Sequence, residues 1–338
     1  MPAIPLTLTL VAAQLVVMLD SSILNVALPS IAEDLGLGPE RTAWVLNAYF
    51  LTFGGLLLVS GRAADVFGRR RMFLIGAAVL ATGSVLGMLA STEGVLIAAR
   101  LIQGAGSALL SPAAMSVILA RFAGPARSRT MSWWGASSAI GGALGVSVGG
   151  LLAGAFGWRS AMLTVAIVAA VIGVIGRLVL PADRPGERRP FDATGAALLT
   201  GAAVAVVFAV LSAPDAGIAS PAVVLAAVVG VAAVVGFVLV ERRVPDPVLP
   251  PGTLGDRRTA GAILVNLLGG AARIACFVLV ALLLQQVLAY DPAVAGLAML
   301  PTSIAGFAIS TMALPGVLTR FGPERTAVAG LVMLAGAH

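Results

Sequence analysis

The stretch "GRAADVFGRRR", residues 61–71, carries five charged side chains in a chain in which only 11% of the residues are charged. Apolar runs flank it on both sides, at residues 43–61 and 72–91. Each run has about the 20 residues that an α-helix needs to cross a lipid bilayer. Because charged side chains enter the hydrocarbon core only at a high free-energy cost, the stretch predicts a short connection at the membrane surface between two spanning helices.

The rest of the chain repeats this pattern, with 59% hydrophobic residues and a mean hydropathy of +1.04. Further apolar runs of spanning length lie at residues 6–28, 94–120, 131–154, 160–180, 193–212, 220–241, 259–287 and 293–319. An eleventh run opens near Thr326 and reaches the last residue, His338, before it is long enough to span. We therefore expect an all-α membrane protein with about ten complete transmembrane helices and a partial eleventh, truncated at its C-terminal side.

All 21 basic residues are arginines, and their distribution predicts which side of the membrane each connection faces. With the N terminus in the cytoplasm, seventeen of them lie in cytoplasmic connections: Arg62, Arg69, Arg70, Arg71, Arg121, Arg127, Arg129, Arg177, Arg184, Arg188, Arg189, Arg242, Arg243, Arg257, Arg258, Arg320 and Arg325. Because positive residues collect in cytoplasmic loops, we expect a multi-pass protein of the cytoplasmic membrane with a cytoplasmic N terminus. The net charge of +6 then requires no nucleic-acid partner.

The residue types that metal sites and most enzymes use are scarce. The only cysteine, Cys276, sits in an apolar run, and the only histidine is His338. The sequence contains no P-loop, no nucleophile elbow and no glycine-rich dinucleotide fingerprint. We therefore expect no enzyme, no cofactor and no metal. A sensor with a soluble signalling domain is disfavoured as well, because no connection exceeds about twenty residues.

An internal repeat organises the chain. The segments "FGRRRMFLIG" at 67–76 and "FGPERTAVAG" at 321–330 share a Phe-Gly pair, an arginine three places after the glycine, and a second glycine five places later. The two copies are eight helices apart, as expected of two six-helix halves separated by a two-helix insert. The predicted parts are an N-terminal six-helix bundle at 1–180, the two-helix insert with its linkers at 181–258, and the start of a C-terminal six-helix bundle at 259–338.

Several segments carry a resemblance to a known family. Residues 61–71 resemble the signature of its loop between helices 2 and 3, and "RLIQGAGSA" at 100–108 matches the signature of its fourth helix. "LDSSILNVALP" at 19–29 is similar to the first-helix signature. "GGALGVSVGG" at 141–150 resembles the fifth-helix antiporter signature, with Val146 in place of a proline. The chain thus resembles the major facilitator superfamily, specifically its fourteen-helix drug:proton antiporters of the EmrB/QacA type.

The resemblance implies a fold and a function. The fold is the major facilitator fold, and the function is proton-coupled efflux of small, largely apolar organic compounds, such as drugs or antibiotics, by alternating access around a central cavity. The partners are then a small-molecule substrate, protons and the lipid bilayer, and we expect a monomer. Three alternatives remain: an exporter of one dedicated metabolite, a proton-coupled importer, and a truncated fragment that does not transport.

For residues 61–71 the resemblance implies a conformational latch that holds the two halves together on the cytoplasmic face while the protein is open to the outside. A carboxylate among arginines is able to form such a charge-assisted network. The alternative is that the arginines only anchor the loop at the membrane surface. The predicted latch residues are Gly61, Asp65, Gly68, Arg69 and Arg70.

Asp20 and Arg100 are charged residues inside apolar runs. Asp20 lies about eight residues, and Arg100 about six, from the outer end of its helix, so at about 1.5 Å per residue both sit at a similar depth. A mutual pair would offset the high free-energy cost of each charge in the bilayer. A proton arriving at Asp20 would then release Arg100, which predicts a proton-coupling site. The alternative is a purely structural brace.

Small and polar side chains in other runs complete the expected site. Glycines along one face of a helix let a neighbour approach closely, which fits both static packing and a gating helix. The candidate gating residues are Gly141, Gly145, Gly149 and Gly150. The expected substrate cavity takes Asn25, Asn47, Gln103 and Arg273. Because Asp20, Arg100 and Arg273 together carry one net positive charge, the cavity favours a neutral or acidic substrate over a dicationic drug.

Overall fold

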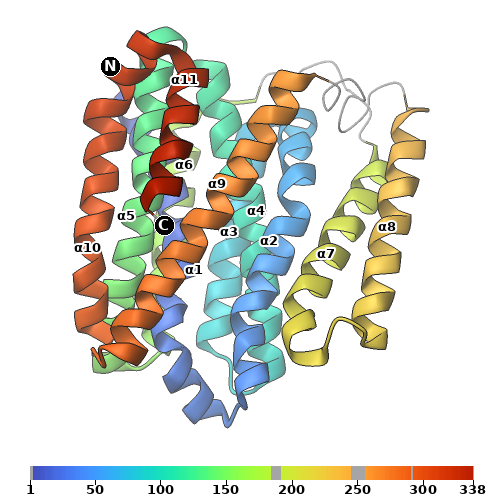
Figure 1. Ribbon diagram of the computed structural model, residues 1–338, viewed down its shortest axis with the longest axis vertical. Helices are drawn as coiled ribbons and strands as arrows, with labels where there is room; N and C mark the ends of the chain where they lie inside the picture. The colour runs from blue at the N-terminus through green and yellow to red at the C-terminus, as the bar shows by residue number, and fades with distance from the viewer. Residues whose placement is uncertain (1–2, 184–191, 245–255, 291, 338) are drawn as a thin grey trace.

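The computed structural model of the protein describes residues 3–183, 192–244, 256–290 and 292–337, and the regular structure in these ranges is entirely helical (Figure 1). The helices are α1 (Ala3–Leu35), α2 (Pro39–Phe67), α3 (Arg69–Met88), α4 (Glu93–Arg121), α5 (Gly124–Phe156), α6 (Arg159–Val179), α7 (Ala193–Ala216), α8 (Pro221–Glu241), α9 (Arg257–Leu282), α10 (Pro292–Ala308) and α11 (Leu314–Ala337). Two π-helical turns, η1 (Leu283–Val287) and η2 (Ile309–Ala313), follow α9 and α10. The predicted all-α class is confirmed.

Helices α1 to α8 coincide with the first eight predicted apolar runs. Eight helices in the described ranges are long and apolar enough to cross a membrane, and a bent pair of segments, Ile304–Ala313 and Gly316–Gly322, would make a ninth. The predicted run at 259–287 is covered by α9 and η1, and the run at 293–319 is divided among α10, η2 and the start of α11. The chain is therefore a multi-pass membrane protein.

Helices α1 to α6 pack around a common apolar core. α1 lies against α5, α6 and α4, and α3 is packed between α4 and α6. Ile23 on α1, Phe73 on α3 and Leu110 on α4 are completely buried in this core. Asp20 and Arg100 are buried in the same bundle. Because protein interiors are close-packed, the core fixes the positions of these two charged side chains.

Two glycines on different sides of α4 let this helix cross its neighbours closely. A Cβ atom at Gly104 would overlap Thr52 and Tyr49 on α2. A Cβ atom at Gly106 would overlap the backbone of Leu80 on α3. The fourth-helix signature therefore has a packing role, because its glycines bring α2 and α3 close to the polar side chains of α4.

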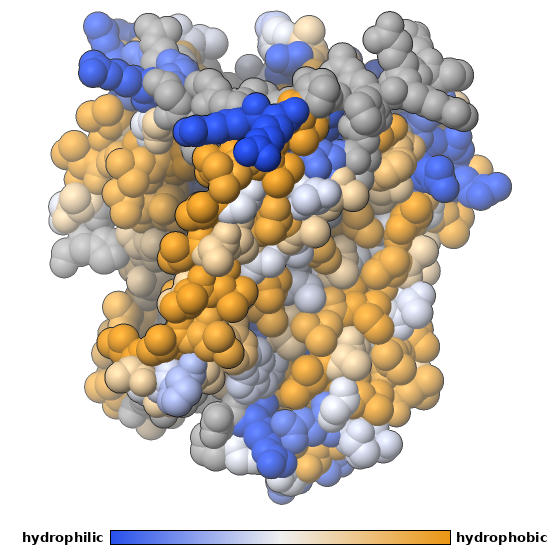
Figure 2. Space-filling view, turned by 90° about the vertical axis from the view of Figure 1, so that its right-hand side faces the viewer, coloured by the Kyte–Doolittle hydropathy of each residue, from blue (hydrophilic) through white to orange (hydrophobic). Residues whose placement is uncertain are grey.

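Helices α7 and α8 pair with each other and lie beside α2 at the edge of the bundle (Figure 1). The rings of Trp44 on α2 and Phe208 on α7 are in contact, with their centroids 5.7 Å apart. On this side of the molecule, apolar side chains form a band between two hydrophilic ends (Figure 2). The segment predicted as a two-helix insert is thus peripheral, whereas the division of the whole chain into three parts stays a prediction.

The last helices contact the first six mainly through α5. α10 and η2 lie against α5, and α11 contacts both α5 and α9. Gly322, with φ +78°, breaks α11, and the matching glycine of the first repeat copy, Gly68, separates α2 from α3 with φ +104°. Because positive φ is accessible mainly to glycine, the two copies of the repeat share a backbone feature as well as sequence.

Candidate functional site

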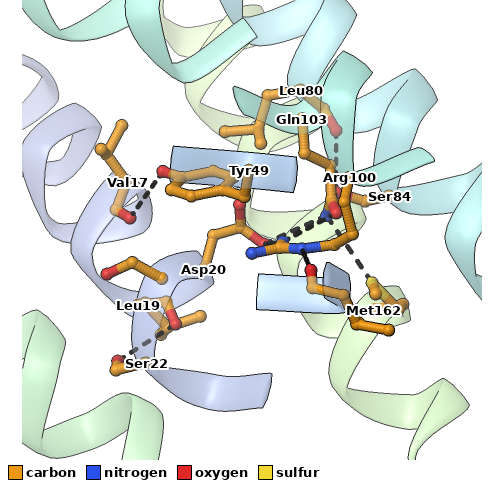
Figure 3. Close-up of polar contacts among 12 residues, drawn as sticks. Val17, Leu19, Asp20, Ser22, Tyr49, Leu80, Ser84, Arg100, Gln103 and Met162 are labelled. Atoms are coloured by element: carbon orange, nitrogen blue, oxygen red, sulfur yellow. Dashed lines mark hydrogen bonds and ion pairs between the residues drawn. The ribbon is translucent and has the colours of Figure 1, made fainter. Parts of the chain in front are cut away.

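The structure brings Asp20 and Arg100 together between α1 and α4 (Figure 3). Nη1 of Arg100 lies 3.1 Å from Oδ1 of Asp20, and both side chains are fully buried. Nε of Arg100 donates to the carbonyl oxygen of Val45 on α2 at 3.1 Å. The Tyr49 ring, also on α2, lies over the guanidinium group, with 4.4 Å from Cζ to the ring centroid. The buried pair therefore ties three helices together.

Gln103, one turn along α4 from Arg100, completes the pair. Its Oε1 accepts from Nη1 of Arg100 at 2.9 Å, and its Nε2 donates to Oδ1 of Asp20 at 3.1 Å. Nε2 also donates to Oγ of Ser84 on α3 at 2.8 Å, and Ser84 donates in turn to the Leu80 carbonyl oxygen. The Gln103 side chain is fully buried and hydrogen-bonded to both members of the ion pair, and its expected place at the substrate cavity stays a prediction.

The two oxygens of the Asp20 carboxylate differ in their surroundings. Oδ1 accepts from Arg100 and Gln103. Oδ2 of Asp20 and Nη2 of Arg100 are buried and have no hydrogen-bond partner in the described part of the chain. A proton at Oδ2 would leave the bonds at Oδ1 in place but remove the charge that attracts Arg100. Protonation there would therefore weaken the link that this ion pair makes between α1 and α4.

Replacing Gln103 with leucine is expected to lower the melting temperature of the purified protein. The variant removes the hydrogen bonds of the Gln103 amide to Asp20, Arg100 and Ser84. The free energy of unfolding should fall by about 1–3 kcal/mol, because these buried groups then lack a partner. Asn25→Leu is the matched control, because Asn25 is exposed and, among the described residues, donates only to the Ser21 carbonyl oxygen of its own helix. Equal melting temperatures for both variants and the wild type would show that the amide does not stabilise the pair.

The predicted latch residues gather at the end of the bundle where α2 joins α3. Oδ1 of Asp65 accepts from Nη2 of Arg69 at 3.2 Å and from Oγ of Ser116 on α4 at 3.2 Å. Gly61 faces α4, and a Cβ atom there would lie 3.9 Å from Pro112. These contacts lie within α2, α3 and α4, so the latch between the two halves stays a prediction.

A cavity of about 360 Å³ opens at the same end of the bundle, which we call the basic end. Its charged lining consists of Asp65, Arg69, Arg70, Arg121 and Asp183. Sequence reasoning did not predict the last of these residues as part of a site, because it lies outside every apolar run and motif. Sequence reasoning did not predict Tyr49 either, although a tyrosine inside the apolar run at 43–61 could have indicated a buried polar contact.

The glycines of α5 face α1. A Cβ atom at Gly141 would lie 2.6 Å from the Leu15 carbonyl oxygen, and one at Gly149 would lie 2.6 Å from the Ile23 carbonyl oxygen. Gly145 lies against Ser22. Among the described residues, a Cβ atom at Gly150 would have only the Val26 side chain near it, at 3.4 Å, so Gly150 lies beside the crossing of α5 and α1 rather than in it. Three of the four candidates thus form a tight contact, and a gating role stays a prediction.

The remaining cavity candidates lie in different environments. Asn25 is exposed and Asn47 is half-buried. The backbone of Arg273 belongs to α9, but its side chain lies outside the described residues. A common cavity formed by these residues therefore stays a prediction.

The fold and the site define a polytopic membrane protein with an ion pair, Asp20–Arg100, enclosed by its helices. A family model described as Major Facilitator Superfamily matches residues 10–337. The chain belongs to the major facilitator superfamily.

Relatives and solved structures agree with this assignment. The chain is 40% identical to the puromycin resistance protein of Streptomyces alboniger over 97% of its own length and 65% of that protein. It is 32% identical to a multidrug efflux pump of Mycolicibacterium smegmatis over 95% of its own length and 64% of that protein. The human organic anion transporter MFSD10 shares the fold, with a TM-score of 0.60 at 18% identity, and the match covers 94% of this chain and 74% of that one. The chain spans about two thirds of the length of the puromycin resistance protein and of the multidrug efflux pump.

Proposed function

We propose that the protein is a proton-coupled exporter of small, largely apolar organic compounds in the cytoplasmic membrane. The observation that carries this proposal is the fully buried Asp20–Arg100 pair, in which one carboxylate oxygen has no partner among the described residues. Two relatives of the chain, a puromycin resistance protein and a multidrug efflux pump, support export as the direction of transport. The peripheral pair α7 and α8 supports the fourteen-helix antiporter branch.

The proposed cycle uses alternating access. A proton that reaches Asp20 from outside neutralises the carboxylate, weakens its hold on Arg100 and favours repacking of α1 against α4. Release of the proton to the cytoplasm restores the pair. In this orientation the N terminus and the basic end face the cytoplasm, as the positive-inside rule predicts. Asp65 and Arg69 then act as the latch on that face, and the protein works as a monomer.

The substrate is proposed to be neutral or acidic, because Asp20 and Arg100 cancel each other and Arg273 adds a positive charge. A second candidate is an exporter of one dedicated compound. It is favoured by relatives that carry the name of a single antibiotic, among them a cephamycin export protein of Amycolatopsis lactamdurans that is 36% identical.

Accumulation assays test both proposals. The complete product of the reading frame is expressed in bacteria that lack their own drug exporters, and uptake of puromycin, a cephamycin and a dicationic dye is measured. We expect lower accumulation of the first two, and a protonophore should abolish the difference. Lowered accumulation of only one compound would favour the dedicated exporter. Raised accumulation would indicate an importer, and unchanged accumulation of all compounds would contradict the proposed export.

A further inference from the structure

Asp183 binds the first turn of α3 from a distant part of the chain. It lies four residues after the end of α6. One of its carboxylate oxygens accepts from the backbone N–H of Arg70 at 2.9 Å, and the other accepts from that of Arg71 at 3.0 Å. The first N–H groups of an α-helix have no partner within the helix, and a carboxylate is favoured there by the helix dipole. Asp183 therefore caps α3 from outside.

The glycine of the loop signature makes this cap possible. Gly68 is the residue before α3, and as a glycine it has no side chain that could cap the helix. Its φ of +104° is accessible mainly to glycine. A Cβ atom at Gly68 would also overlap the Asp183 carboxylate. Gly68 thus both turns the chain and leaves room for an acidic side chain from another segment.

A further hydrogen bond joins the same two segments. Nη2 of Arg70 donates to the Arg177 carbonyl oxygen, in the last turn of α6, at 2.6 Å. A cation at this position is favoured, because the last carbonyl groups of a helix carry partial negative charge. The start of α3 is therefore held by one hydrogen bond to the last turn of α6 and by two to Asp183 in the segment after it.

We propose that Asp183 is a positioning residue of the α2–α3 junction, residues 61–71. By fixing the first turn of α3, it holds Arg69 where that side chain reaches Asp65. The conformation of this junction then depends on Asp183, in the segment that follows α6. The capping itself does not depend on the proposed function, but its effect on transport rests on that function.

Amide hydrogen exchange measures the cap directly. In Asp183→Ala the exchange of the Arg70 and Arg71 amides is expected to accelerate at least about tenfold, because each loses a charge-assisted hydrogen bond. Asp65→Asn is the matched control, since it changes the same cavity but leaves both capping bonds in place. If Asp183→Ala does not reach the membrane, Asp183→Asn keeps the shape and removes the charge. Unchanged exchange in a folded Asp183 variant would overturn the proposal.

Transport assays on the same variants test the consequence. We expect Asp183→Ala and Asp65→Asn to slow substrate efflux while substrate binding stays unchanged, and the double variant to be no slower than the slower single variant. Faster exchange with normal efflux would overturn the positioning role and leave only a structural cap. If the wild type moves no substrate, the proposed function fails, but the exchange measurement still decides whether Asp183 caps α3.

Discussion

Replacing Asp20 with asparagine is expected to reduce substrate-driven proton movement to the background of vesicles that lack the protein. Asparagine keeps the size of the side chain and its contact with Gln103, but it cannot bind and release a proton near neutral pH. Asp20 is the carboxylate that lies fully buried against Arg100. The measurement is acidification or alkalinisation of everted membrane vesicles after substrate is added.

Two further variants separate coupling from stability. Asp20→Asn leaves the buried Arg100 without its counterion, at a cost of about 3–5 kcal/mol, so the amount of folded protein must be measured as well. The double variant Asp20→Asn, Arg100→Gln removes both charges and is expected to recover stability but not proton movement. Asp34→Asn is the matched control on α1, because Asp34 pairs with Arg159 at 2.7 Å and both side chains are nearly half exposed. Normal proton movement in folded Asp20→Asn would contradict the coupling role.

The pairing of Asp20 with Arg100 could be predicted from the sequence, because their positions along the apolar runs indicate a similar depth in the membrane. Two charged residues in apolar runs, counted from the same membrane surface, fall at similar heights, and each needs a partner. The position of Gln103 could not be predicted in this way. One turn from Arg100, it was compatible with an open cavity as well as with the buried pair, and only the rotation of α4 against α1 and α3 decides between them.

The cap from Asp183 was beyond sequence reasoning for a different reason. The carboxylate oxygens of Asp183 accept from backbone N–H groups more than a hundred residues away. Every residue except proline has such a group, so the sequence does not indicate which one is bound. The repeat, in contrast, was visible in the sequence, and the positive φ of Gly68 and Gly322 adds a shared backbone feature. The proposed latch stays untested, because the contacts of Asp65 given above connect helices of the first half only.

Replacing Gly141 with alanine is expected to destabilise the protein by about 1–3 kcal/mol, the usual range for overpacking. The new methyl group would lie 2.6 Å from the Leu15 carbonyl oxygen and 2.9 Å from Cβ of Met18, so α1 and α5 must move apart. Gly142→Ala is the matched control, because no atom of the described residues lies within 4 Å of a Cβ atom there. Since alanine favours the helix over glycine by about 1 kcal/mol, this control should melt at the same temperature or higher.

The same series separates packing from gating in α5. If the glycines serve static packing, Gly141→Ala and Gly149→Ala should lower the melting temperature, and the double variant should lose less than the sum, because one outward shift of α5 relieves both contacts. If they also serve gating, substrate turnover per folded molecule should fall in addition to the loss of stability. Equal stability and equal turnover in Gly141→Ala and Gly142→Ala would contradict both roles. The close approach of α5 to the Leu15 and Ile23 carbonyl oxygens favours packing, since backbone atoms cannot move aside as a flexible side chain can.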